Sequence, residues 1–212
     1  MNKMKAVAVI VAHPDDEALW AGGTILMHPR WNFFIISLCR AGDPDRAPRF
    51  FNALRFLGAE GKIGDLDDGP DQVPLPEGRV QQHILHLLSG QTFDLVITHD
   101  IHGEYTRHLR HEETARAVVA LWYQGKITMK ELWMFAYEDG KRRYLPQPVK
   151  TADCYTPLPA GVWQKKYKLV TEIYGFAPAS WEARTVPKAE AYRQFATAAD
   201  AQVRLDIQGE LS

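Results

Sequence analysis

Residues that can bind a metal ion or transfer a proton gather in two short stretches of this sequence. The first is the run HPDDE at residues 13–17, which places one imidazole, His13, beside three carboxylates. Imidazole and carboxylate groups are ligands for divalent metals such as zinc. A helix cap would use only one carboxylate and leave His13 unexplained, so we favour a metal site over capping alone. A dinucleotide site is disfavoured because it needs glycines here, and Gly22 and Gly23 come too late.

The second stretch is HDIHGEYTRHLRHEE at residues 99–113. His108 and His111 are three residues apart, so on a helix they share one face. We interpret them as a second group of metal-binding side chains, with a solvated helix face as the alternative. His99 and His102 are weaker candidates, suited to supporting the ligands.

Each stretch directly follows a segment that is typical of a buried strand. Residues 6–12 are small or β-branched apolar residues, and Pro14 must end that strand near His13. Residues 93–98, FDLVIT, have the same character. In an open α/β sheet, ligands bind outside the carboxyl ends of the strands. We therefore expect both stretches to meet at one edge of a sheet.

The remaining segments complete an alternating pattern of strands and helices. We predict further strands over residues 31–39, 60–68 and 131–137. We predict helices over residues 18–27, between Asp45 and Gly58, over 77–88, from Thr106 or Arg107 to 123, over 162–173 and over 187–199. The pattern predicts an α/β, Rossmann-like single domain over residues 1–212, with a mainly parallel sheet flanked by helices. Its core spans about 5–140. An irregular C-terminal extension over about 141–212 should form a pocket wall or a subunit contact, which leaves a homo-oligomer open.

Composition narrows the functional classes. The 212 residues are 46% hydrophobic and carry a net charge of −1, which argues against nucleic acid or an anionic membrane as the main partner. The first apolar run is too short for a signal peptide or a membrane span and leads straight into the charged motif, so we expect a cytoplasmic protein. Cys39 and Cys154 lack CxxC spacing, which fits a reducing compartment.

Other polar groups have simpler interpretations. Arg46 and Arg49 lie near the predicted pocket, and we favour solvated arginines over substrate-binding ones. His83 and His86 share a helix face without a neighbouring carboxylate, so we favour a solvated face there too. The loops over residues 65–78 and 140–161 are rich in proline and glycine, and we expect them to border the pocket and shape substrate choice.

AHPDDE at residues 12–17 after an apolar strand, with His108-x-x-His111 after the fourth strand, resembles the LmbE-like or PIG-L family of zinc-dependent de-N-acetylases. The resemblance covers about residues 5–137. It implies that His13, Asp16 and His111 bind Zn²⁺, that Asp15 is the general base and that His108 assists the tetrahedral intermediate. It also implies a small-molecule substrate, an N-acetylglucosamine-type amino sugar or glycoconjugate.

The sequence departs from the common family pattern at three places. The second motif reads HLRH at residues 108–111, where many members have His-Pro-Asp-His. The aromatic pair Phe50 and Phe51 replaces a glutamate often found on the second helix, and a frequent Ser-Gln pair is absent after Tyr174. These differences do not alter His13, Asp16 or His111. They bear instead on which substrate the protein takes.

General chemistry is consistent with the same roles. Three protein ligands with an open position are typical of a catalytic zinc site, which lowers the pKa of bound water to about 7. Asp15 is then free to accept the water's proton, and a protonated His108 can stabilise the oxyanion. Two histidines and a carboxylate also describe non-haem iron oxygenases. A sugar- or nucleotide-binding module with a structural metal is the non-enzymatic alternative. The spare Asp15 favours hydrolysis.

Overall fold

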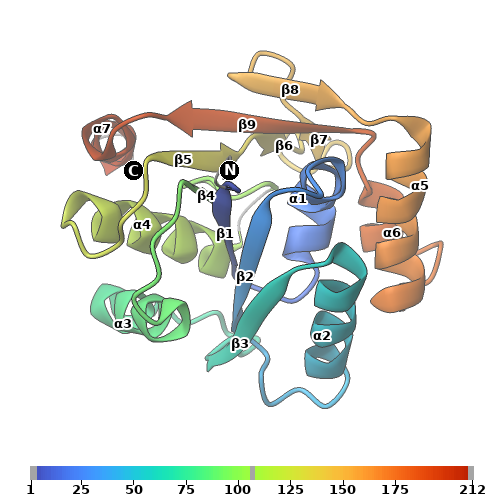
Figure 1. Cartoon of the computed structure of the whole chain (residues 1–212), viewed down its shortest axis with the longest axis horizontal. Coiled ribbons are helices and arrows are strands. Elements are labelled where there is room, and N and C mark those ends of the chain that lie inside the picture. Colours follow the sequence, from blue (N-terminus) through green and yellow to red (C-terminus); the bar gives the residue numbers. More distant parts are fainter. Residues whose placement is uncertain (1–3, 106–107, 210–212) are drawn as a thin grey trace.

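The structure is a computed structural model that describes residues 4–105 and 108–209. Within these ranges a seven-stranded mixed sheet runs through the molecule (Figure 1). Its strands, in spatial order, are β3 (Glu60–Leu66), β2 (Asn32–Cys39), β1 (Ala6–Val11), β4 (Leu95–Thr98), β5 (Glu131–Phe135), β9 (Ala189–Phe195) and β8 (Cys154–Pro157). The first five are parallel, whereas β9 is antiparallel to both β5 and β8. The predicted α/β fold with a mainly parallel sheet is confirmed.

Helices cover both faces of this sheet (Figure 1). One face carries α3 (Glu77–Leu88), α4 (Leu109–Tyr123) and α7 (Ala198–Gly209). The other face carries α1 (Asp16–Met27), α2 (Arg46–Leu57) and α5 (Ala160–Lys168). Helix α5 continues as the π-helical turn η1 (Leu169–Ile173). The short helix α6 (Trp181–Thr185) lies beside η1. In β1, Val7 and Val9 pack toward α1 and α2, and Ala8 and Ile10 toward α3 and α4. Burial on both faces explains why this strand is apolar at every position.

The direction in which strands are added to the sheet reverses at β1. Strands β2 and β3 follow on one side of β1, and β4 and β5 on the other. Such a switch point leaves a crevice outside the carboxyl ends of the two central strands. His13 lies two residues beyond β1, and His99 directly follows β4. The two histidine-containing stretches therefore meet at one sheet edge, as predicted.

The C-terminal third contains the main departure from the prediction. The helix expected over residues 187–199 is wrong, because Ala189–Phe195 forms β9 and α7 begins only at Ala198. Alanine, glutamate, arginine and glutamine in this run favour a helix locally. Pairing with β5 on one side and β8 on the other outweighs that preference. The extension is thus less irregular than expected, since it supplies two strands of the main sheet and α5 to α7. A small hairpin of β6 (Tyr137–Glu138) and β7 (Gln147–Pro148) spans the point where the extension begins.

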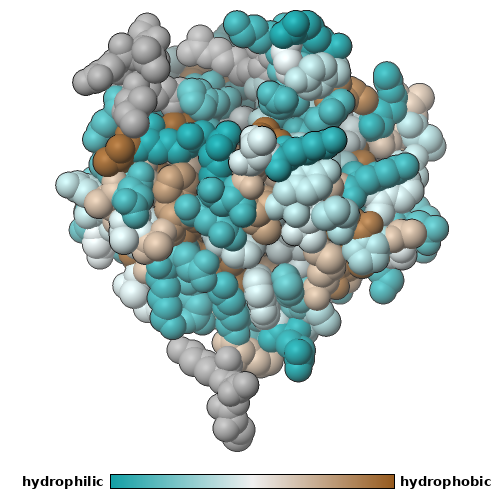
Figure 2. All heavy atoms as spheres, turned by 90° about the horizontal axis from the view of Figure 1, so that it is seen from above, coloured by the Kyte–Doolittle hydropathy of each residue, from teal (hydrophilic) through white to brown (hydrophobic). Residues whose placement is uncertain are grey.

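In the part of the chain that the structure describes, no helix is both long and apolar enough to cross a bilayer. Seen from above, the molecule is mainly hydrophilic, with hydrophobic residues in small scattered patches (Figure 2). Of the two cysteines, Cys39 is buried and Cys154 is partly buried, and both are free thiols.

Candidate metal centre

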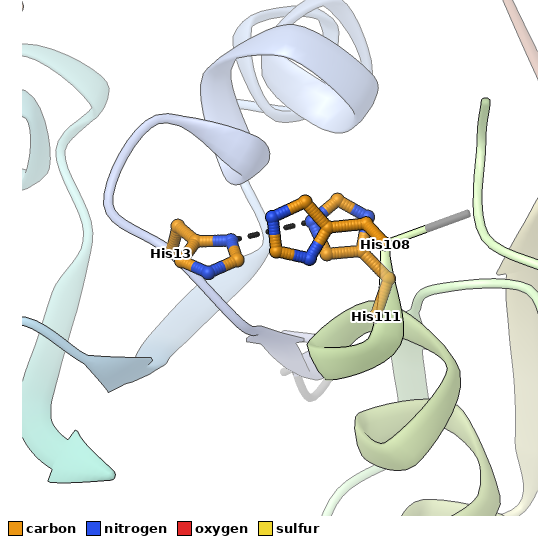
Figure 3. Close-up of side chains that lie close together, drawn as sticks. All are labelled: His13, His108 and His111. Atoms are coloured by element: carbon orange, nitrogen blue, oxygen red, sulfur yellow. Dashed lines mark hydrogen bonds between the residues drawn. The ribbon is translucent and has the colours of Figure 1, made fainter. Parts of the chain in front are cut away.

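Three side chains converge where β1 and β4 end. His13 Nδ1 lies 3.2 Å from Asp16 Oδ2 and 3.3 Å from His111 Nε2, and the last two atoms are 3.3 Å apart. Figure 3 shows how His13, from the turn after β1, faces His111 on α4. Zinc bonds of about 2.0–2.2 Å in tetrahedral geometry separate ligand atoms by roughly 3.3–3.6 Å. This donor set fits a single divalent ion, and its three members are the residues that the family resemblance implies as zinc ligands.

A carboxylate holds each imidazole on the side away from this centre. Asp68 Oδ1 is 3.1 Å from His13 Nε2, and Glu104 Oε2 is 2.6 Å from His111 Nδ1. Metal-binding histidines almost always have such outer partners, which fix the orientation of the ring. Arg40 in turn holds Asp68, with its Nε 3.0 Å from Asp68 Oδ2. The sequence patterns do not identify either carboxylate as part of the site, although Asp68 lies in the loop predicted to border the pocket.

His99 supports the centre without an open ligand atom. The N–H of Ala12 donates to His99 Nε2 at 3.0 Å, so Nδ1 carries the ring proton and donates to Glu104 Oε2 at 2.9 Å. The His99 ring stacks on His111, with centroids 3.9 Å apart. Both ring nitrogens of His99 are therefore engaged. His102 is exposed.

Three other combinations of donor atoms are also close enough to hold a metal ion. Two of them overlap with this centre, namely His13 with His108 and His111, and Asp16 with His99 and His111. The third combines His13 with Cys39 and Asp68. Burial raises the pKa of the Cys39 thiol, which disfavours the thiolate that a metal requires. The group with Cys39 is therefore less suited to a metal ion than the group with Asp16 and His111. His83 and His86 belong to no such group among the described residues.

The charged groups around the centre favour a positive charge between the carboxylates of Asp16 and Glu104. Burial opposes ionisation of Asp16, but the imidazoles of His111 and His99 hold its pKa well below the usual range. Burial likewise opposes a charged His111, but Asp16 and Glu104 raise its pKa to about 10. The site thus keeps Asp16 ionised and stabilises positive charge beside it.

Asp15 points into the pocket from a strained turn. Its φ of 118° is in the left-handed region, and its side chain makes no capping hydrogen bond, which argues against the capping alternative. Its backbone N–H donates to Glu17 Oε2 at 3.1 Å, and Glu17 Oε1 accepts from the Tyr174 hydroxyl at 2.5 Å. Burial and then Asp16 raise the pKa of Asp15 well above the usual range, while Arg46 opposes the rise.

His108 lies over the same centre. It occupies the N-cap position of α4; Thr106 and Arg107, where we expected this helix to begin, lie outside the described residues. Its ring stacks on His111 at 4.4 Å and meets His13 edge-on at 4.6 Å (Figure 3). Burial, reinforced by the charges of His111 and His13, lowers the pKa of His108 to about 3. The sequence leaves the charge of His108 open, and these surroundings favour the neutral imidazole.

A cavity of about 280 Å³ opens above the centre. Besides the histidines and aspartates, its lining includes Arg40, Arg46, Tyr105 and Trp181. Arg46 is not the solvated arginine we favoured, because its guanidinium lies over the Phe176 ring and its Nη1 is 3.6 Å from Asp15 Oδ2. Arg49 instead contacts Asp45 and the Tyr174 carbonyl.

Several solved structures have the same fold. The N,N'-diacetylchitobiose deacetylase from Pyrococcus horikoshii matches with a TM-score of 0.68 at 16% identity, over 91% of this chain and 84% of that one. The zinc-inhibited form of teicoplanin deacetylase matches with a TM-score of 0.60 at 16% identity, over 80% and 84%. GalB, the 4-carboxy-2-hydroxymuconate hydratase from Pseudomonas putida, matches with a TM-score of 0.62 at 16% identity, over 90% and 96%. At these identities the likeness concerns the fold, which serves deacetylases and a hydratase alike.

Sequence comparison is more specific. One curated relative, an uncharacterized protein of Acanthamoeba polyphaga mimivirus, is 24% identical over 144 residues, and the match spans 61% of each chain. The family model of PIG-L, described as GlcNAc-PI de-N-acetylase, matches residues 8–122, which is more than half of the chain and includes both histidine-containing stretches. The resemblance carried by the two motifs is confirmed, and the chain belongs to the PIG-L family.

Proposed function

We propose that this protein is a zinc-dependent N-deacylase that removes an acetyl or other acyl group from an N-acetylglucosamine-type amino sugar or glycoconjugate. One observation carries the proposal: the ligand atoms of His13, Asp16 and His111 converge within 3.3 Å, with Asp15 spare beside them. Membership of the PIG-L family supports amide hydrolysis, and the deacetylases among the solved structures support a sugar-containing substrate.

His13 Nδ1, Asp16 Oδ2 and His111 Nε2 would hold the zinc ion, which when bound supplies a Lewis acid for the acyl carbonyl and lowers the pKa of water. Asp68 and Glu104 orient the two imidazoles for this purpose. The protein's own contribution is thus a fixed ligand set and an ionised Asp16.

Asp15 serves as the general base. It accepts a proton from the water that attacks the acyl carbon, and the proton then passes to the amine nitrogen as the C–N bond breaks. The products are a carboxylic acid and a free amine, so the atoms balance. Burial and the neighbouring Asp16 raise the pKa of Asp15, which makes its carboxylate a stronger base. The hydrogen bond from its backbone to Glu17 holds it in position.

His108 contributes as a neutral imidazole. Its ring lines the pocket and stacks on His111, so a ring N–H can donate to the acyl oxygen as negative charge develops there. A donor that is already in place stabilises the transition state more than the neutral amide. Removal of His108 should therefore lower kcat more than it changes KM.

A metal-exchange experiment separates this proposal from the oxygenase alternative, which uses the same type of ligand set. The metal-free protein is loaded anaerobically with Zn²⁺ or Fe²⁺ and offered a panel of N-acetylated amino sugars. Amine release and oxygen consumption are measured together. Amine release by the zinc form, abolished in His111→Ala and with no oxygen consumed, supports the proposal. Oxygen consumption by the iron form without amine release in either form contradicts it.

A further inference from the structure

A second, larger cavity adjoins the metal pocket. Its volume is about 700 Å³, against about 280 Å³ for the pocket above the metal centre. Tyr105, Trp181 and Glu182 line both cavities and so form a common wall. A substrate whose acyl group lies at the metal centre can extend across this wall into the larger cavity.

Among the described residues, three arginines line the larger cavity: Arg142, Arg143 and Arg184. Exposed arginines are usually solvated. These three come from two separate segments, the β6–β7 turn and α6, yet border one cavity. No carboxylate of the described residues lies within 4.0 Å of their guanidinium nitrogens. The lining also contains Asp139 and Glu182, so its positive charges outnumber its negative ones in a chain whose net charge is −1.

The β6–β7 turn presents its arginines in a fixed way. Lys141 and Arg142 have φ of 60° and 64°, in the left-handed region that residues with side chains rarely adopt. The turn is held by Asp139, whose carbonyl accepts from Arg143 N–H at 3.0 Å and whose Oδ1 accepts from Lys141 N–H at 3.0 Å. Arg143 Nε also donates to the Gly140 carbonyl at 2.7 Å. A turn ordered in advance reduces the entropy lost when a ligand binds.

The shared wall supplies an aromatic surface. Trp181 is 37% exposed, so part of its indole ring is accessible to a ligand. The rings of Tyr105 and Trp181 meet edge to face, with centroids 4.9 Å apart, which leaves part of the indole open to the cavities. Such a surface suits the apolar face of a sugar ring.

We propose that the larger cavity binds an anionic group, a phosphate or a carboxylate, on the part of the substrate remote from the scissile amide. Arg142, Arg143 and Arg184 would hold this group, with Trp181 beneath the connecting ring. The guanidinium fork matches the geometry of both anions. The assignment of the acyl group to the metal centre rests on the proposed function, whereas binding of the anion does not.

The test compares three glycosides of N-acetylglucosamine: the neutral methyl glycoside, the 1-phosphate and the carboxymethyl glycoside. Wild-type protein should cleave at least one anionic compound with a kcat/KM about tenfold or more above that of the methyl glycoside. Preference for the phosphate or for the carboxylate alone identifies the group. Arg142→Gln, Arg143→Gln and Arg184→Gln should each reduce this preference, because KM rises more for the anionic compounds than for the methyl glycoside. Arg30→Gln, an exposed arginine between α1 and β2, is the matched control.

Equal kcat/KM for all three glycosides, or arginine variants that lower all three alike, would overturn the proposal. Calorimetry with the deacetylated ligands, glucosamine 1-phosphate, carboxymethyl glucosaminide and methyl glucosaminide, keeps it separate from the proposed function. If no acetylated compound is cleaved but an anionic ligand binds wild type more tightly than it binds the Arg142→Gln/Arg184→Gln variant, the proposed function fails and the anion site stands. If hydrolysis occurs without any arginine-dependent preference, the anion site fails and the proposed function stands.

Discussion

Asp68 Oδ1 lies 3.1 Å from His13 Nε2, on the side of the imidazole opposite the metal centre. Asp68→Asn keeps the size of this partner but removes its charge. We expect metal affinity to fall by about 10- to 100-fold, because the imidazole loses its orienting carboxylate. Competition with a chelator measures the affinity. Asp71→Asn, in the same loop and exposed, is the control. Unchanged affinity in Asp68→Asn would show that Asp68 does not orient His13.

Asp15→Asn tests the general base. The amide is nearly isosteric with the carboxylate but cannot accept the water's proton, so turnover should fall by about 100-fold or more. Zinc content should stay at the wild-type value, since Asp15 is not assigned as a ligand. Metal analysis and amine release on the same sample check both statements. Near-normal turnover with zinc bound would remove Asp15 from the mechanism.

Tyr174→Phe tests how the strained turn is held. The Tyr174 hydroxyl donates to Glu17, whose other oxygen accepts from the Asp15 N–H. Without that donor, Glu17 should hold Asp15 less well, and we expect kcat to fall roughly tenfold with KM and zinc content unchanged. Tyr123→Phe, at an exposed position on α4, is the control. A loss of kcat explained wholly by lost zinc would contradict this role.

Lys166→Met tests a buried ion pair beneath α1. Lys166 Nζ lies 2.5 Å from Glu190 Oε1, and both side chains are fully buried. Removal of the lysine leaves the Glu190 carboxylate buried without its cation, which typically costs about 3–5 kcal/mol of unfolding free energy. Urea unfolding measures this loss. Lys165→Met, exposed on the same helix, should change stability by less than about 0.5 kcal/mol. Equal losses in the two variants would show that the ion pair contributes nothing.

The sequence predicts the parts of the site that depend on local order. The apolar run of β1 and Pro14 fix where His13 and Asp16 lie. The three-residue spacing brings His108, the N-cap residue of α4, against His111 in the first turn of that helix. These features require only strand periodicity, helix periodicity and the rule for parallel sheets.

Local sequence patterns do not reveal Asp68 and Glu104, the carboxylates that hold the imidazoles of His13 and His111. Asp68 reaches His13 across 55 residues of chain, and no local pattern distinguishes it from Asp67 or Asp71. Strand β9 is not predicted from the sequence for a related reason. Its pairing partners β5 and β8 are separate segments of the chain, and its own composition favours a helix. Contacts that depend on tertiary placement became visible only in the structure.

The most direct test of the metal-dependent N-deacylase assignment is a zinc titration of the metal-free protein, with amine release from N-acetylated amino sugars as the readout. We predict that activity rises linearly with zinc and reaches a plateau at one equivalent, and that His13→Ala and His111→Ala stay inactive at the same zinc concentration. Full activity without metal, or no amine release from any compound with one equivalent of zinc bound, would contradict the assignment.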